Sequence, residues 1–367
     1  MVRSADAVVV GGGVIGVSAL YHLAARGVRD VVLLERDTLG GGSTAAAAGG
    51  FRAQFSDELN IRLALRCIDA YQRFQAEFDI DIGFRQTGYL FLLRAEEEPH
   101  FRTALRLQQS MGVPAELVPV DEALRHVPGT SPDGLSAATF CPIDGLATPH
   151  AVVQGYAAAA RRLGAHIVQH DAVREILVRD GRVAGVRSAQ GEIATPLVVL
   201  ASGVWSPELA RTAGVDLPVT AERRFVHYVA SDAGLPARTP LTIDFATGLY
   251  FHREGAGLIV GGPWATPEEL APVALQRLPF LADLGVANTW SGLYEMSPDH
   301  NALVGRCDEP AGLLYATGFS GHGFQQAPGI GEYLADLALD REPALDLSAL
   351  SIRRFTDDLS RPELHVV

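Results

Sequence analysis

Three glycines near the start of the sequence have the spacing of a nucleotide-binding turn. Gly11, Gly13 and Gly16 form the pattern G-x-G-x-x-G between two apolar segments, and Glu35 ends the next apolar segment. Such glycines allow a tight turn, close approach of the backbone to a pyrophosphate, and close packing of a helix on a strand. A carboxylate at the position of Glu35 can accept hydrogen bonds from both hydroxyls of a ribose. The motif therefore predicts a site for an ADP-containing dinucleotide rather than a plain glycine turn.

These residues need a βαβ unit to position them, and a second strand–glycine–helix unit closes the chain. Short Val-rich runs indicate buried strands, longer amphipathic or Ala-rich stretches indicate helices, and Asp-Gly at 180–181 indicates a hairpin turn. We expect strands at Asp6–Val10, Val31–Leu34, Tyr89–Leu93, His166–Gln169, Ala172–Val178, Val183–Val186, Leu197–Leu200, Phe225–Val229, Leu249–His252, Leu258–Val260 and Leu313–Ala316. We expect helices at Val14–Arg26, Asp57–Glu77, Glu97–Met111, 151–163 and Pro328–Leu339.

Small residues gather in further segments that face the same predicted site. Residues 40–50 read GGGSTAAAAGG, Ala201–Gly203 follows a buried strand, and a glycine turn spans 318–323. The first segment lacks the charged residues of a flexible linker and directly follows the nucleotide unit, so we interpret it as a loop that contacts the cofactor. An NAD dehydrogenase usually continues through more βα units of one sheet. Separate glycine segments that converge on one cofactor favour the longer FAD.

Composition excludes several classes of protein. Apolar residues make up 48% of the chain and charged residues 20%, as in ordinary globular proteins. The net charge of −13 argues against a nucleic-acid partner, which needs clustered positive charge. No run of eighteen apolar residues is present, so we expect no membrane span. Cys67, Cys141 and Cys307 lie far apart, which argues against disulfides and zinc and fits the cytoplasm.

Some chemistries are excluded by missing residue types. All 30 cationic residues are Arg, so a Schiff-base lysine and a P-loop lysine are impossible. The sequence has no HExxH motif and no paired Cys/His set, so we expect no metal. It also lacks the GxSxG motif of a serine hydrolase.

Several motifs together resemble the D-amino-acid oxidase superfamily of flavoproteins. The matching segments, which span nearly the whole chain, are GGGVIG at 11–16 with Glu35, STAAAAGGFR at 43–52, ASGVWS at 201–206, SPDHNALVG at 297–305 and ATGFSGHGFQQAPGIGE at 316–332. Within the superfamily the chain is most similar to sarcosine oxidases, glycine oxidases and the catalytic subunits of proline dehydrogenases. The last segment is the most specific of the five.

The resemblance implies an α/β (α+β) fold with two interleaved domains. A Rossmann-like FAD-binding domain would comprise residues 1–84, 145–218 and 293–367. A substrate domain on a mostly antiparallel β-sheet would comprise 85–144 and 219–292. Relatives with covalent flavin carry a Cys at the place of Gly292 or a His near Gly49–Gly50, so this chain is expected to bind FAD noncovalently.

The resemblance also implies which residues bind FAD, with the backbone of Val173 placed to meet the adenine. These residues are Gly11, Gly13, Val14, Ile15, Gly16, Glu35, Arg36, Ser43, Thr44, Ala48, Gly49, Gly50, Val173, Ala201, Ser202, Gly203, Trp205, Gly292, Gly318, Gly321, His322, Gly323, Phe324 and Gln325. Backbone N–H groups at Gly321–Gly323 and the helix that follows would stabilise negative charge on the reduced flavin.

Four side chains are candidates for contact with the substrate. Arg52 follows the cofactor loop, and its fork suits a carboxylate, although it could instead be a surface residue. Tyr250 and His252 lie two residues apart on one predicted strand and so share a face. A core Tyr and a solvent-facing His are the alternative. His322 stands between two glycines and could face the flavin, the substrate or a backbone carbonyl.

These residues predict an FAD-dependent oxidoreductase that oxidises the C–N bond of a small amine or amino acid. Hydride transfer to flavin N5 would give an imine. A 2-hydroxy-acid dehydrogenase, with His252 or His322 as the base, and a subunit of an electron-transfer complex are the alternatives. Related oxidases place lysines where this chain has Ile259 and Gln325, so oxygen and an electron carrier both remain candidate acceptors. A homo-oligomer and accessory subunits also remain open.

Overall fold

The computed structural model describes residues 4–366. Its first sheet has six strands in the order β18-β19-β12-β1-β2-β8, all parallel except the edge strand β18. The inner strands are buried on both faces, which is why they read as continuous apolar runs. Their bounds are β1 Ala7–Val10, β2 Val31–Leu34, β8 His166–Val168, β12 Val198–Leu200, β18 Leu303–Arg306 and β19 Leu313–Thr317.

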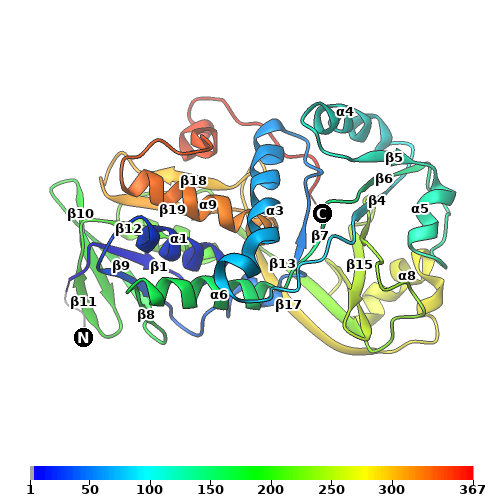
Figure 1. The fold of residues 1–367 in the computed structure, drawn as a ribbon, viewed down its shortest axis with the longest axis horizontal. Coiled ribbons are helices and arrows are strands. Elements are labelled where there is room, and N and C mark those ends of the chain that lie inside the picture. The colour runs from blue at the N-terminus through cyan, green and yellow to red at the C-terminus, as the bar shows by residue number, and fades with distance from the viewer. Residues whose placement is uncertain (1–3, 367) are drawn as a thin grey trace.

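Helices cover one face of this sheet and a small sheet covers the other (Figure 1). Alternate residues of β1 divide between the two cores: Val9 packs on the helical side, and Val8 packs against the small sheet. The helices are α1 Val14–Ala25, α3 Glu58–Phe78, α6 Pro149–Arg162 and α9 Gly323–Ala338. The opposite layer consists of β9 Val173–Arg179, β10 Arg182–Ser188, β11 Gly191–Ala194 and α7 Ser206–Thr212.

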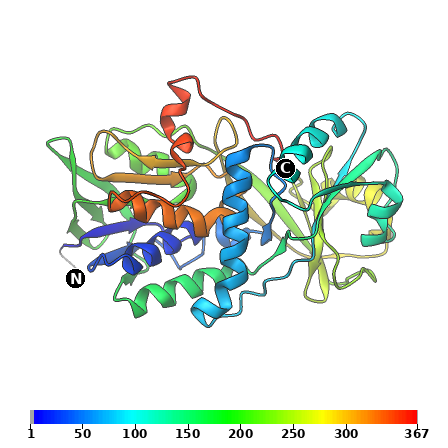
Figure 2. The ribbon, with the colours of Figure 1, turned by 45° about the horizontal axis from the view of Figure 1, so that its top comes forward.

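A second sheet of eight strands lies beside the first (Figure 2), in the order β17-β13-β16-β15-β14-β4-β6-β5. All its pairings are antiparallel except that of β4 with β14. The strands are β4 Tyr89–Leu93, β5 Glu116–Val118, β6 Ala137–Cys141, β13 Thr220–Val229, β14 Leu241–Asp244, β15 Leu249–Glu254, β16 Gly257–Gly262 and β17 Val286–Met296. Around it lie α4 Glu98–Ser110, α5 Val120–His126 and α8 Pro267–Arg277.

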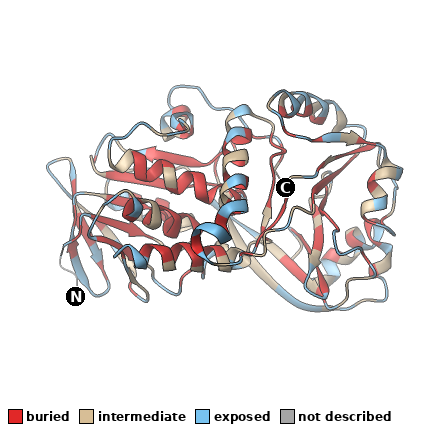
Figure 3. Ribbon diagram, in the orientation of Figure 1, coloured by how far each residue is buried: buried red, intermediate tan, exposed pale blue. Residues whose placement is uncertain are grey.

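Short elements complete the chain. They are α2 Ser43–Ala46, β3 Gly50–Phe51, β7 Gly145–Leu146, η1 Gly203–Trp205, η2 Pro279–Leu281, η3 Ser348–Leu350 and η4 Ile352–Phe355. Buried residues concentrate in the sheets and on the inner faces of the helices (Figure 3). Within residues 4–366 no helix is long and apolar enough to cross a membrane, and no cluster of His, Cys, Asp and Glu could hold a metal.

The predicted fold class is confirmed, and the bounds of the expected elements agree within two residues, except at the starts of β13 and α9. Strand β13 begins at Thr220, five residues before the expected Phe225. The helix expected at Pro328 begins five residues earlier, at Gly323, with Pro328 inside it. A proline has no N–H to give to the carbonyl four residues before it, here Phe324. The hydroxyl of Tyr71 on α3 donates a hydrogen bond to that carbonyl instead. A partner from a distant helix therefore compensates for the proline.

The interleaved domain division stays a proposal. The strands of the six-stranded sheet come from residues 7–34, 166–200 and 303–317, and those of the eight-stranded sheet come from 89–141 and 220–296. Strand β17 runs through the proposed boundary between 292 and 293. This strand therefore carries residues of the eight-stranded sheet toward the nucleotide side.

Candidate cofactor and active site

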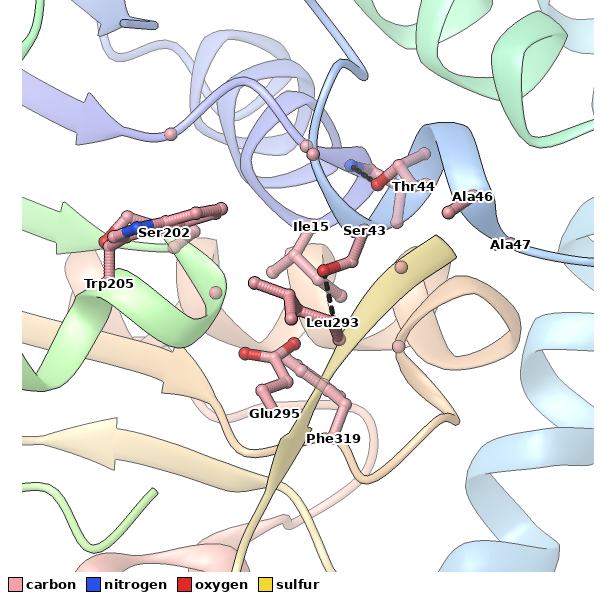
Figure 4. A pocket seen from close by; sticks show the side chains of 18 of the residues that line it. Ile15, Ser43, Thr44, Ala46, Ala47, Ser202, Trp205, Leu293, Glu295 and Phe319 are labelled. Carbon is pink, nitrogen blue, oxygen red and sulfur yellow. Dashed lines mark hydrogen bonds between the residues drawn. The ribbon is translucent and has the colours of Figure 1, made fainter. Parts of the chain in front are cut away.

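A cavity of about 610 Å³ extends from the nucleotide motif to the eight-stranded sheet. Its volume falls within the roughly 300–1,000 Å³ typical of ligand sites. Its walls come from the start of α1, the segment around α2, the start of β9, η1, strands β13, β15 and β17, and the turn before α9 (Figure 4). Segments far apart in the sequence thus meet at one site.

The first end of the cavity is formed by the G-x-G-x-x-G turn. Gly11 has a φ of +108°, and a Cβ on it would lie 2.4 Å from the carbonyl oxygen of Ala201. A Cβ on Gly16 would lie 1.9 Å from the carbonyl oxygen of Gly11, so Gly16 serves the packing of α1 on β1. Glu35 Oε2 accepts a hydrogen bond of 2.6 Å from Gly12 N. The turn and the carboxylate are thereby fixed to each other.

The small-residue loop after β2 is held against the cavity. Thr44 Oγ1 accepts a hydrogen bond of 3.1 Å from Val14 N at the start of α1. Ser43 Oγ donates one of 2.7 Å to the carbonyl oxygen of Leu293 on β17 (Figure 4). A Cβ on Gly292 would lie 2.7 Å from the Cβ of Ala46, so the loop and β17 touch at that glycine. The loop therefore bridges the two sheets.

Aromatic and charged side chains flank Glu35 at the first end. The guanidinium of Arg36 lies 3.6 Å from the ring centroid of Trp205, a stacked cation–π arrangement. Val173 and Arg174 of β9 line the cavity in the same region as the predicted adenine contact. A flat ring system and a ribose fit this mixture of apolar and polar groups.

The other end of the cavity holds an arginine between two tyrosines. Arg224 of β13, Tyr250 of β15 and Tyr294 of β17 all line it. The guanidinium carbon of Arg224 lies 5.4 Å from the ring centroid of Tyr294. Burial raises the pKa of both tyrosines, and Arg224 partly offsets the shift. The ring of Tyr294 packs on Gly321, where a Cβ would lie 2.7 Å from it.

Arg52 lies outside the cavity lining, in a buried cluster. Its guanidinium donates to the carbonyl oxygens of Gln54 and His365 and lies 3.0 Å from His322 Nε2. The side chain is 4% exposed. These three protein partners occupy the guanidinium of Arg52, which we predicted to bind a substrate carboxylate. That role stays a prediction, and the cavity offers Arg224 as an alternative.

The two candidate histidines are also buried and do not line the cavity. His252 Nδ1 donates to the carbonyl oxygen of Arg253 at 2.9 Å. Burial lowers the pKa of His252. Burial and the neighbouring Arg52 hold the pKa of His322 well below its usual range. Both side chains are therefore neutral at neutral pH.

Most residues predicted to bind the cofactor line this cavity. The exceptions are Gly16, Gly318, His322 and Gln325. Tyr250 is the one catalytic candidate on the wall. The sequence prediction missed Arg224, Tyr294 and Glu295, since a strand pattern does not say which face meets a cavity. The roles of all these residues toward a ligand stay predictions.

Comparisons with known proteins agree with this geometry. The model of the DAO family, described as FAD dependent oxidoreductase, matches residues 6–337. L-proline dehydrogenase from P. horikoshii has a similar structure, with a TM-score of 0.90 and 31% identity over 98% of this chain and 99% of that one. The resemblance to this superfamily is confirmed.

Two curated relatives show how far the similarity extends. The chain is 31% identical to 4-methylaminobutanoate oxidase (formaldehyde-forming) of Paenarthrobacter nicotinovorans, over 95% of this chain and 45% of that protein. It is 32% identical to FAD-dependent oxidoreductase domain-containing protein 1 of Xenopus laevis, over 96% of this chain and 82% of that protein. The chain thus spans less than half the length of the first relative.

Proposed function

The chain belongs to the DAO family of FAD-dependent oxidoreductases, and from this premise we propose that it oxidises a small amino acid at a carbon next to a secondary amine. Two relatives are named for substrates of this kind, 4-methylaminobutanoate and L-proline. Each of these molecules carries both a secondary amine and a carboxylate. FAD, when bound, accepts a hydride from the carbon next to the nitrogen.

The observation that carries the proposal is the position of Arg224 between Tyr250 and Tyr294. Only Nη1 of Arg224 has a protein partner, Glu222, among the residues that the structure describes. The other guanidinium nitrogens of Arg224 are available to donate hydrogen bonds to a carboxylate. The two tyrosines stay protonated and can donate hydrogen bonds or wall the site. We therefore assign carboxylate binding to Arg224 rather than to Arg52.

The remaining predicted residues take supporting roles in this proposal. The cavity lining, within residues 4–366, contains no histidine to act as a base. This composition supports an amine that arrives neutral, and it counts against a 2-hydroxy acid, which needs a base near its hydroxyl. The N-terminus of α9, at Gly323, lines the cavity with its partial positive charge. Arg52 and His322 would fix the loop after β3.

A substrate panel tests the proposed function. The FAD-loaded protein is mixed anaerobically with N-methyl amino acids, proline, primary amino acids, amines without a carboxylate, and 2-hydroxy acids. We expect the flavin absorbance to bleach with secondary amino acids and to persist with hydroxy acids and simple amines. Bleaching by hydroxy acids alone would contradict the proposal.

We further propose that FAD is bound noncovalently. Covalent flavin links use residues such as Cys and His, and none of either type lines the cavity among the residues that the structure describes. Gly292 and Gly49 stand where relatives with covalent flavin carry a Cys or a His, and a Cβ on Gly49 would lie 2.3 Å from the carbonyl oxygen of Ala147. Acid precipitation is therefore expected to release yellow FAD into the supernatant. Flavin that stays in the pellet would refute this proposal.

The cellular compartment, the electron acceptor and the partner subunits are proposals as well. The three cysteines are free thiols, which supports a reducing compartment such as the cytoplasm. Oxygen and an electron carrier are the two candidate electron acceptors, and a homo-oligomer and accessory subunits both stay open. Arg224 is the cavity-lining cation nearest the two tyrosines, and its charge would favour the reaction of a reduced cofactor with oxygen.

A further inference from the structure

Glu295 is a carboxyl group inside the cavity that no part of the proposed chemistry uses. It lies near the end of β17, and Figure 4 shows its side chain among the residues that line the cavity, near Leu293, Ile15 and Phe319. Its Oε2 lies 2.8 Å from Thr317 Oγ1 and 3.2 Å from Gly318 N. Thr317 is the last residue of β19 and Gly318 follows it, so Glu295 joins the two large sheets where they meet the cavity.

If both short contacts of Thr317 Oγ1 are hydrogen bonds, they need one more proton than the threonine has. Thr317 Oγ1 lies 3.0 Å from the carbonyl oxygen of Gly203 and 2.8 Å from Glu295 Oε2. A hydroxyl has one proton to donate, and a carbonyl can only accept. If Thr317 donates to Gly203, its contact with Glu295 is a hydrogen bond only when the carboxyl is protonated and donates. If Glu295 were ionised, Thr317 could donate to only one of its two neighbours. Its hydroxyl oxygen would then face the other, Gly203 O or Glu295 Oε2, without a proton between them.

Within residues 4–366 no cation forms an ion pair with Glu295. On β13, Arg223 shares the sheet face of Glu295, but its Nη1 donates to Ser291 Oγ. Glu222 and Arg224 lie on the opposite face of β13 and pair with each other, and Glu208 of α7, which also lines the cavity, adds no positive charge. Burial raises the pKa of Glu295 to about 7, and the hydrogen bond that Gly318 N–H donates only partly opposes this shift. The carboxyl is therefore mainly neutral below about pH 7, and the neutral acid is the form that satisfies both contacts of Thr317.

We propose that Glu295 is a neutral carboxylic acid that donates its proton to Thr317, and that binding of FAD takes up one proton from solvent to keep it so. The inference rests on FAD as the ligand of this cavity. Bound FAD would displace water from the partly exposed side chain and bring a negatively charged diphosphate into the same cavity. Both effects oppose ionisation of the carboxyl. Glu295 is thus a positioning residue for the cofactor, and its state links FAD affinity to pH.

The sign of the linkage follows from the two states of the protein. FAD binding raises the affinity of Glu295 for its proton, so the full FAD affinity is present at pH values below about 7, where the free protein is already protonated. Above that pH the affinity falls by up to tenfold for each pH unit, the limit for one linked proton. Titration of the apoprotein with FAD, followed by flavin fluorescence between pH 5.5 and 8.5, measures this slope. Calorimetry in buffers of different ionisation enthalpy measures the proton uptake directly.

Glu295→Gln provides the decisive variant. Its amide can donate to Thr317 at every pH, so we expect an FAD Kd close to the low-pH value of the wild type and nearly constant across the range. Glu208→Gln, which also removes a carboxyl from the cavity lining, should keep the wild-type slope. An equal slope in wild type and Glu295→Gln would overturn the inference. Tight but pH-independent binding by the wild type would also overturn it, whereas no FAD binding at any pH would overturn the cofactor assignment as well.

Discussion

Gly13→Ala should weaken FAD binding by roughly 30- to 1,000-fold without unfolding the apoprotein. Gly13 lies at the N-cap of α1 and lines the cavity beside the helix N-terminus. Its backbone, with φ −71° and ψ 177°, is accessible to alanine, and a Cβ there would meet only Thr44 Oγ1, at 3.4 Å. The added methyl group would hold a diphosphate away from the N–H groups of the helix, with a loss of about 2–4 kcal/mol of charge-assisted hydrogen bonding.

The measurement is a fluorescence titration of the apoprotein with FAD, beside its urea unfolding curve. Gly285→Ala is the matched control, because a Cβ there has no neighbour within 4 Å and the residue lies outside the cavity lining. We expect wild-type FAD affinity for the control and unfolding free energies within about 0.5 kcal/mol of wild type for both variants. An unchanged Kd for Gly13→Ala would place the diphosphate elsewhere.

The nucleotide side of the molecule was predictable because its signals are local. The strand, glycine turn and helix at 7–25 follow one another in the sequence, and each has its own periodicity or residue preference. The tight approach at Gly16 is to Gly11 of the same unit, whereas that at Gly11 is to Ala201, remote in sequence, so the glycine spacing predicted a close approach there but not its partner. The fold class followed from these segments together with the family resemblance.

The start of α9 was not predictable in the same way. Proline is a helix breaker by local rules, so the sequence pointed to a start at Pro328. The helix continues back to Gly323 because Tyr71, remote in sequence, donates to the carbonyl of Phe324. A hydrogen bond between distant segments leaves no local signal, so only the structure could reveal this one.

The substrate end of the cavity was the least predictable part. Arg52 stands next to the cofactor loop in sequence, yet its side chain turns to Gln54, His322 and His365. Arg224 sits in a strand whose orientation depends on its pairing with β17, where it lies opposite Gly292. Since successive residues of a strand face opposite sides, Arg223 and Arg224 were equivalent until that pairing was known.

The last prediction concerns Arg224→Gln. Because Arg223 and Arg224 lie on opposite faces of β13, Arg223 provides the control. Arg223 is exposed, and its Nη1 donates to Ser291 Oγ, so Arg223→Gln removes the same charge from the other face of β13. Steady-state kinetics are measured with paired substrates, one amine with a carboxylate and its analogue without one. We expect Arg223→Gln to leave kcat/KM unchanged for both.

Arg224→Gln should lower kcat/KM for the carboxylate-bearing amine by roughly 30- to 150-fold, which corresponds to about 2–3 kcal/mol for a charged hydrogen bond. The analogue without a carboxylate should lose little, because it has no partner for the guanidinium. Arg52→Gln separates the two candidate arginines. It leaves the buried carbonyl of His365 without its donor and leaves that of Gln54 with His365 Nδ1 alone, so we expect lower stability and a similar loss of kcat/KM for both substrates. A loss confined to the carboxylate substrate in Arg52→Gln, with Arg224→Gln unaffected, would return the anchoring role to Arg52.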